Sequence, residues 1–207
     1  MAELCQIYWP PVYGFLRGRG HSPGDAEDLT QGFFATLLER ESFSSADPEK
    51  GKMRSYLRVA AKRYAMNQSE RGRAAKRGGG VLPASLAVDE LEARLVDGAA
   101  EDPERAFDKS WALALLGKVL ETMEAEYKDA GKGELFESLK PALSPDGGER
   151  EAGEGLNLSD GARRVAVHRL RKRYRELLRA AIAETVTDPE HIDEEIRYLM
   201  ELFSDSS

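Results

Sequence analysis

Helical periodicity is the feature that most restricts the fold of this 207-residue chain. Apolar residues recur at three- and four-residue steps in one segment after another, as in Leu29, Phe33, Leu37 and Leu38. That spacing places them on one side of an α-helix, whereas no segment of useful length shows the two-residue alternation of a β-strand. The pattern therefore predicts an all-α fold with little or no sheet.

The first strong helix is expected over residues 22–39, and its opening is acidic. The run Ser22-Pro23-Gly24-Asp25 offers an N-cap serine, a proline at the first helical position and an acid at the third, a pattern that satisfies free backbone N–H groups. The apolar residues named above would face the core, and Phe34 would lie partly exposed, off the centre of that stripe. A shorter helix is expected before it, over 10–17.

The segment 50–77 is strongly basic and is expected to form a helix over 53–76. Its density of cations predicts contact with phosphates. Two rings for stacking and two amides that could read base edges lie in the same segment, namely Tyr56, Tyr64, Asn67 and Gln68. The alternative is a solvated or core-supporting helix, because Tyr56, Leu57 and Tyr64 also fit a buried stripe. One acid, Glu70, stands among the cations Lys50, Lys52, Arg54, Arg58, Lys62, Arg63, Arg71, Arg73, Lys76 and Arg77.

Residues 78–102 are expected to be a flexible linker with one weak helix over 89–95, because glycine and short acidic groups interrupt any period. Asp102 and Pro103 then start a new helix. A shorter helix is expected over 135–143. The buried face of the helix that begins at Pro103 would consist of Phe107, Trp111, Leu115, Leu116, Val119, Met123 and Tyr127.

Ser159 is expected to cap a long helix that ends near residue 182. Its inner face would include Val165 and Leu170, and its outer face is cationic, as in a recognition helix that enters a DNA groove. A solubilising cationic surface is the alternative. The outward residues are Arg164, His168, Arg171, Arg175 and Arg179.

The last helix, which starts after Asp188 and Pro189, is acidic. Ile192, Ile196, Leu199 and Phe203 would form its apolar stripe, and its acids, including Glu195, would stay in water. We expect this helix to pack on the second domain, where it could shield the basic recognition helix.

The net charge and the composition of the chain limit the functions that it can have. The formal net charge of -7 at pH 7 argues against a free-standing, nonspecific nucleic-acid binder, so positive charge must act locally. The single cysteine, Cys5, excludes an internal disulfide, and no signal peptide or membrane span is visible, which predicts a cytoplasmic protein. The scattered histidines predict no metal site, and nothing predicts a cofactor or an enzyme.

Four segments together resemble the extracytoplasmic-function (ECF) type of bacterial RNA polymerase sigma factor, especially the planctomycete, verrucomicrobia and acidobacteria group. They lie at 8–13, 20–34, 53–57 and 159–174, and the run Ala26-Glu27-Asp28-Leu29-Thr30-Gln31-Gly32-Phe33-Phe34 is the most specific. Departures are the short lead-in from Met1 to Trp9, and Arg163, which stands where the pattern usually has a buried valine.

The resemblance implies an initiation factor of two small helical domains, with a region 2-like domain over 1–77, the linker over 78–102 and a region 4-like helix-turn-helix domain over 103–207. Its partners would be core RNA polymerase, promoter DNA and an anti-sigma factor. The implied polymerase contacts are Asp25, Asp28, Gln31 and Phe34. The implied -10 contacts are Arg54, Tyr56, Arg58, Lys62, Arg63, Asn67 and Arg71, and the implied -35 contacts are Arg164, His168 and Arg169.

Two other classes of protein stay open at this point. A degenerate sigma-like interaction protein would bind polymerase or an anti-sigma partner without reading a promoter. A helix-turn-helix regulator would bind duplex DNA through the C-terminal basic block and would leave residues 25–34 as ordinary core and surface. Charge reversal at Asp28 separates the regulator from a sigma factor, because only a sigma factor would lose transcription.

Overall fold

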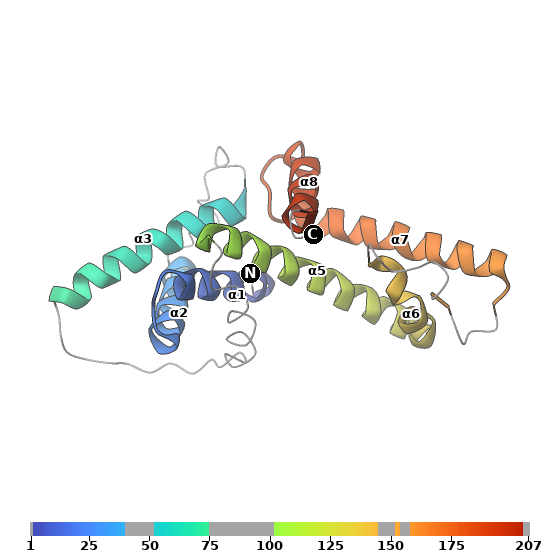
Figure 1. Cartoon of the computed structure of the whole chain (residues 1–207), viewed down its shortest axis with the longest axis horizontal. Coiled ribbons are helices and arrows are strands. Elements are labelled where there is room, and N and C mark those ends of the chain that lie inside the picture. The colour runs from blue at the N-terminus through green and yellow to red at the C-terminus, as the bar shows by residue number, and fades with distance from the viewer. Residues whose placement is uncertain (1, 40–51, 75–101, 145–151, 154–157, 205–207) are drawn as a thin grey trace. The chain divides into compact units, whose positions relative to one another are not determined.

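The computed structural model describes residues 2–39, 52–74, 102–144, 152–153 and 158–204, and over these the predicted all-α fold is confirmed (Figure 1). The described residues contain no strand; a single antiparallel bridge joins Lys52 to Val186. The expected linker as far as residue 101, with its weak helix over 89–95, lies outside the described residues. The helices are α1 (Ala2–Gly18), α2 (Pro23–Glu39), α3 (Met53–Ala74), α5 (Pro103–Asp129), α6 (Gly133–Leu139), the 3-10 helix η2 (Lys140–Leu143), α7 (Asp160–Ala183) and α8 (His191–Ser204).

The chain forms two compact units. One comprises Met1–Ala114 together with Thr185–Ser207, and the other comprises Leu115–Glu184. This division differs from the expected one, because it falls within the continuous helix α5 and returns the C-terminal segment to the first unit. None of the described helices is long and apolar enough to cross a membrane.

The core of the first unit is centred on α1, which is longer than the expected 10–17 helix. Pro10 and Pro11 lie inside it, where their missing N–H groups leave two carbonyls without helical partners. Phe15 of α1 meets Phe107 of α5 edge to face, with ring centroids 6.0 Å apart. The fully buried hydrophobic side chains described for α1 are Tyr8, Val12, Tyr13, Phe15 and Leu16.

Helix α2 begins as predicted, at the serine cap. The Ser22 hydroxyl accepts the backbone N–H of Asp25 at 3.2 Å and donates to the Asp25 carboxylate at 2.6 Å. Two predictions for α2 are wrong: Phe34 is buried, with 4% exposed, and Leu38 is 47% exposed. The reason is that α1 covers the Phe34 side of α2, where the Trp9 and Phe34 rings stack at 5.7 Å.

The second unit has its own core around α6 and α7. Phe136 and Leu139 of α6 pack with Met123 of α5 and with Val167 and Leu170 of α7. The N-cap at Ser159 is confirmed, since its hydroxyl accepts the Ala162 N–H at 3.3 Å. Val165, predicted to face inward, is 50% exposed instead, because the buried stripe of α7 passes through Val167 and Leu170.

The last helix, expected to pack on the second domain, lies in the first compact unit, where it contacts α3 and the start of α5. The backbone N–H of Met53, at the start of α3, donates to the Thr185 carbonyl at 2.9 Å, and Thr185 is buried. Side chains of α8 then reach α3 and α5. Glu195, expected to stay in water, is 1% exposed.

Candidate nucleic-acid interface

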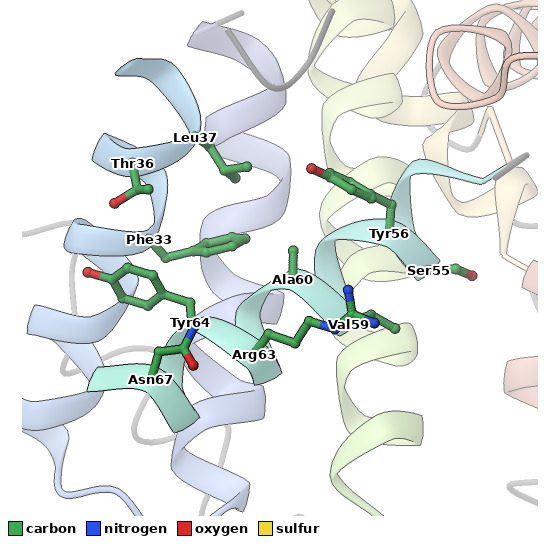
Figure 2. A pocket seen from close by; sticks show the side chains of 10 residues that line it. All are labelled: Phe33, Thr36, Leu37, Ser55, Tyr56, Val59, Ala60, Arg63, Tyr64 and Asn67. Atoms are coloured by element: carbon green, nitrogen blue, oxygen red, sulfur yellow. The ribbon is translucent and has the colours of Figure 1, made fainter. Parts of the chain in front are cut away.

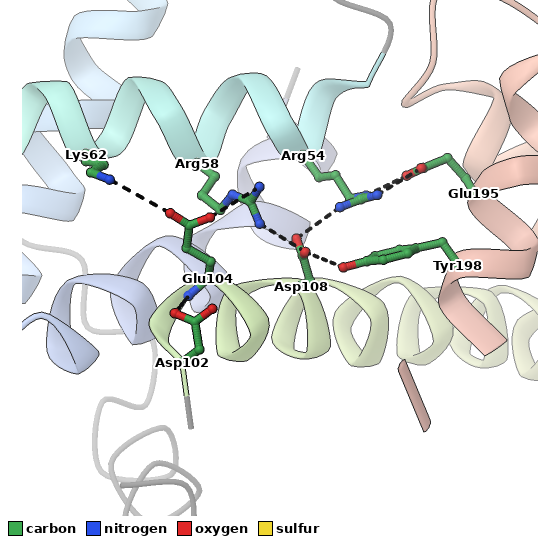
Figure 3. A network of polar contacts seen from close by, with 8 residues as sticks. All are labelled: Arg54, Arg58, Lys62, Asp102, Glu104, Asp108, Glu195 and Tyr198. Carbon is green, nitrogen blue, oxygen red and sulfur yellow. Dashed lines mark hydrogen bonds and ion pairs between the residues drawn. The ribbon is translucent and has the colours of Figure 1, made fainter. Parts of the chain in front are cut away.

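Helix α3 presents two different sides within the first unit. Tyr56, Ala60, Arg63 and Asn67 follow one another at three- and four-residue steps and lie on the side that faces α2 (Figure 2). Arg54, Arg58 and Lys62 follow one another at four-residue steps on the side that faces α5 and α8 (Figure 3). We call the side that faces α2 the pocket side and the side that faces α5 and α8 the paired side. The cations of α3 are divided between these two environments.

The pocket side opens onto a cavity of about 500 Å³ between α2 and α3. Its walls are mainly aromatic and apolar, and polar atoms stand at a few points: the Arg63 guanidinium, the Asn67 amide and hydroxyls. Such a cavity suits a flat ligand that has polar edges, because rings stack on its faces while the amide donates to or accepts from its rim. The lining residues are Phe33, Thr36, Leu37, Ser55, Tyr56, Val59, Ala60, Arg63, Tyr64 and Asn67.

The wall between the two helices depends on a glycine. A Cβ atom at Gly32 of α2 would overlap the hydroxyl of Tyr64, so only glycine allows the tyrosine to approach this closely. Tyr64 in turn meets Phe33 edge to face, with ring centroids 5.9 Å apart. The pair of rings closes one side of the cavity, as Figure 2 shows.

On the paired side, Arg54 is the centre of a buried network. Its side chain is 8% exposed; Nε donates to Glu195 Oε2 at 2.7 Å, and Nη2 donates to Glu195 Oε1 at 3.1 Å. Its Nη1 pairs with Asp108 Oδ1 at 3.1 Å. The guanidinium also lies over the rings of Tyr198, at 4.0 Å, and Trp111, at 5.5 Å. Each of the three guanidinium nitrogens makes one of these polar contacts, an arrangement that lysine could not supply.

The network continues along α3 away from Arg54 (Figure 3). Arg58 donates to Asp108 Oδ2 at 3.0 Å and lies 3.6 Å from Glu104, which also pairs with Lys62 at 3.8 Å. The Tyr198 hydroxyl donates to Asp108 Oδ2 at 2.6 Å. Asp108 therefore ties α3, α5 and α8 together.

The ionisation of these groups follows from their surroundings. Burial by itself would raise the pKa of Glu195, but hydrogen bonds and charges from Arg54 and Lys52 outweigh burial and lower this pKa. Burial would lower the pKa of Arg54, yet Glu195 and Asp108 raise it. Burial and the bond to Asp108 raise the pKa of Tyr198 to about 12. Arg54 and Glu195 are therefore both charged at neutral pH, with Tyr198 a neutral donor.

The residues predicted for the -10 strand divide between the two sides. Tyr56, Arg63 and Asn67 line the cavity. Arg54, Arg58 and Lys62 instead pair with carboxylates of the same chain. Arg71 lies in the last turns of α3, where the structure describes the backbone only.

The sequence reasoning missed the acids of this network, although a signal was present. Glu195 stands between Ile192 and Leu199 at steps of three and four, on the apolar stripe of α8. A charge on such a stripe indicates a buried partner. Asp108 is likewise a charge on an apolar stripe, because it lies three residues before Trp111 on the buried side of α5.

The residues predicted for polymerase contact lie along α2. Asp25 and Asp28 are exposed, and Gln31 is half-buried and donates to Glu27 at 3.4 Å. Phe34 is buried in the stack with Trp9. The structure thus brings two acids to the surface of one helix, with the aromatic ring on its inner side.

In the second unit, Arg164, His168 and Arg169 are exposed on the first half of α7. Nearby cations are engaged within the unit: Arg171 donates to the Ala142 carbonyl at 3.1 Å, and Arg173 donates to Glu126 at 2.8 Å. The exposed half of α7 therefore offers cations, while its later turns hold α5 and η2.

Comparison with known proteins adds one finding. Residues 4–74 match the family model described as Sigma-70 region 2, a stretch that includes both helices lining the cavity. No curated protein and no solved structure matches the chain. The N-terminal segment is thus similar to region 2 of the sigma-70 proteins, and the match supports a sigma-70 family member.

Proposed function

We propose that the chain is a bacterial sigma factor of the ECF type, which binds core RNA polymerase in the cytoplasm and directs it to promoter -10 and -35 elements. The observation that carries the proposal is the α2–α3 cavity, because it lies within the segment similar to Sigma-70 region 2 and is lined by three residues predicted for the -10 strand. Such a factor supplies recognition, and no catalytic step is assigned to it.

The cavity is the place where an unstacked base of the -10 element would bind. Taking a base out of a duplex costs a few kcal/mol, which stacking on aromatic walls and bonds to its edge can offset. Tyr56 and Tyr64 supply rings, Asn67 supplies the amide, and Arg63 at the rim supplies charge for the adjoining phosphate. A nucleobase is therefore the ligand class that this cavity fits best.

The exposed half of α7 would read the -35 element as duplex. Arg164, His168 and Arg169 lie close to its capped N-terminus, and the first turns of a recognition helix are those that enter a major groove. Arg163, one of the departures from the family pattern, pairs with Asp160 at 3.1 Å at the start of this helix.

Helix α2 would contact the polymerase through Asp25 and Asp28, both of which are exposed. Gln31 lies one turn further along the same helix. Phe34 stays a predicted contact, and its buried stack with Trp9 supports a role in holding α2 against α1.

Gel filtration of the chain with sigma-free core polymerase, followed by an open-promoter assay on a genomic library, tests the proposal. Co-elution together with open complexes at selected promoters is the expected result. The variant Asp28→Lys should lose co-elution, whereas Glu121→Lys, the same reversal at an exposed position of α5, should keep it. Wild-type protein that does not co-elute with polymerase overturns the proposal.

A second candidate is a sigma-like protein that binds polymerase without opening promoters. The paired side of α3 favours it, because Arg54 and Arg58, both predicted for the -10 strand, are already bound to carboxylates. Co-elution without open complexes on any promoter of the library would identify this function.

A further inference from the structure

Helix α8 meets the basic helix α3 through its acids. Glu195 binds Arg54, and both Glu195 and Glu194 pair with Lys52, at 3.0 Å and 3.2 Å. Tyr198, one turn later, covers the Arg54 guanidinium with its ring. Helix α8 thus neutralises Lys52, just before α3, and Arg54, in the first turn of α3. Figure 3 shows the pairing of Arg54 with Glu195.

The contact is of the kind that nucleic acid itself would make. Carboxylates and phosphates both present paired oxygens to a guanidinium fork, and both bind a lysine ammonium. Arg54 cannot serve both at once, because its side chain is buried while it is bound to Glu195 and Asp108. Binding of α8 and binding of a phosphate at Arg54 therefore exclude each other.

Helix α8 follows an exposed turn, which comes directly after a backbone anchor beside α3. Thr185 and Val186, which precede α8, are held to Met53 and Lys52 by backbone contacts. Beyond them Asp188 and Pro189 are exposed, so bending there would swing α8 away while its tether stays beside α3. When α8 is packed as in this structure, its apolar contacts come from three buried residues, Ile192, Leu199 and Leu202.

We propose that α8 is an intramolecular latch that competes with the nucleic-acid backbone for Arg54 and Lys52 and lowers the affinity of the free chain for DNA. This inference rests on the proposed function, since it assumes that α3 contacts a DNA strand. It assigns a regulatory role to the C-terminal helix, separate from promoter reading.

The first test compares the full chain with Glu195→Gln and with the matched control Glu190→Gln, which removes the same charge from an exposed position before α8. Binding of a fluorescein-labelled, single-stranded, mixed-sequence 12-nucleotide DNA is measured by anisotropy over a series of salt concentrations. Glu195→Gln should bind at least about 5-fold more tightly, within the usual range for coupled sites. Glu190→Gln should behave as the wild type does.

The salt series distinguishes a latch from a general change of charge. Each additional cation that contacts a single strand steepens the slope of log K against log salt by about 0.7. Glu195→Gln removes the carboxylate shared by Arg54 and Lys52, whose other acidic partners are Asp108 and Glu194. If DNA then takes over both cations, the slope of Glu195→Gln should steepen by up to about 1.4, whereas the control slope stays that of the wild type. Far-UV circular dichroism checks that both variants are folded.

A second measurement needs no variant. If DNA displaces α8, a saturating concentration of the same oligonucleotide must speed hydrogen exchange of the α8 amides in the wild-type chain, because coupling between two binding events is reciprocal. A purely structural α8 would exchange at an unchanged or slower rate.

The outcomes separate the latch from the proposed function. Tighter binding by Glu195→Gln, or faster exchange of α8 in wild-type chain with DNA, supports the latch. Equal affinities and slopes for all three proteins, with unchanged exchange, overturn the latch and leave the proposed function standing. If neither the wild type nor Glu195→Gln binds the probe, the DNA-binding part of the proposed function fails and the latch fails with it.

Discussion

Both sides of α3 carry arginine, but the arginine is exposed to solvent on one side and buried on the other. On the pocket side, Arg63 and Asn67 are exposed at the rim of an apolar cavity. On the paired side, Arg54 is buried among carboxylates and rings. One helix therefore uses arginine both as a surface group open to a ligand and as an internal cross-link.

The difference shows that a count of cations overstates the surface offered to DNA. A buried guanidinium loses its hydration, and only well-placed acids make up for this loss. Those acids then occupy its donors, as Glu195 and Asp108 do for Arg54. Among the α3 cations whose side chains the structure describes, Arg54, Arg58 and Lys62 pair with acids of the same chain, whereas Arg63 lies exposed at the cavity.

The strongest way to test this contrast is Arg54→Ala. It would leave Asp108 and Glu195 buried without their partner, and breaking a buried pair in this way costs about 3–5 kcal/mol. Urea denaturation measures the free energy of unfolding. On the pocket side, Arg63→Ala should change it by no more than about 0.5 kcal/mol, as at most surface positions. Equal losses for the two variants would contradict the division into two sides.

The glycine that shapes the pocket side offers the next effect in size. Gly32→Ala places a methyl group against the Tyr64 hydroxyl, and such overpacking costs about 1–3 kcal/mol, partly offset by the better helix preference of alanine. Gly24→Ala, where an added Cβ meets nothing within 4 Å, is the control and should not destabilise the chain. Thermal unfolding compares the two. A neutral Gly32→Ala would mean that Tyr64 moves freely and that the cavity wall is not fixed.

The fold and the pocket side were largely predictable from the sequence, because local signals determine them. Three- and four-residue spacing identified the helices, and Ser22 and Ser159 marked two of the helix starts. Tyr56 and Asn67 were singled out by residue type, and Arg63 by the family resemblance; the three do share one cavity. Their contact with DNA remains a prediction.

The paired side could not be predicted in the same way, because its partners are far apart along the chain. Arg54 and Glu195 are separated by 141 positions. A hydrophobicity pattern assigns each charge to water, so Glu195 was expected to be exposed. The signal was that Arg54, Asp108 and Glu195 all occupy positions in apolar stripes, where a charge requires an opposite charge. The partner of each could be found only from the tertiary structure.

Replacing Tyr56 on the pocket side should change the free energy of DNA binding by no more than Gly32→Ala changes the free energy of unfolding. If its ring stacks on a base, Tyr56→Ala should weaken binding of single-stranded -10 DNA by about 1–3 kcal/mol, whereas Tyr56→Phe keeps the ring and should lose little. Fluorescence anisotropy with polymerase present measures both. Equal loss in the two variants would point to the hydroxyl rather than to stacking.

The smallest effect concerns pH and belongs to the paired side. The pKa of Glu195 is lowered in the folded chain, so the stability that it contributes is complete above its ordinary pKa of about 4.3 and is lost as pH falls through the lower folded value. Arg54 and Lys52 face this carboxylate, and Asp108, Glu104 and Glu194 are the other acids of the network. Unfolding free energies of wild type and Glu195→Gln should therefore differ most near neutral pH and converge in acid. A difference that is constant from neutral to strongly acidic pH would show that Glu195 acts through packing and not through its charge.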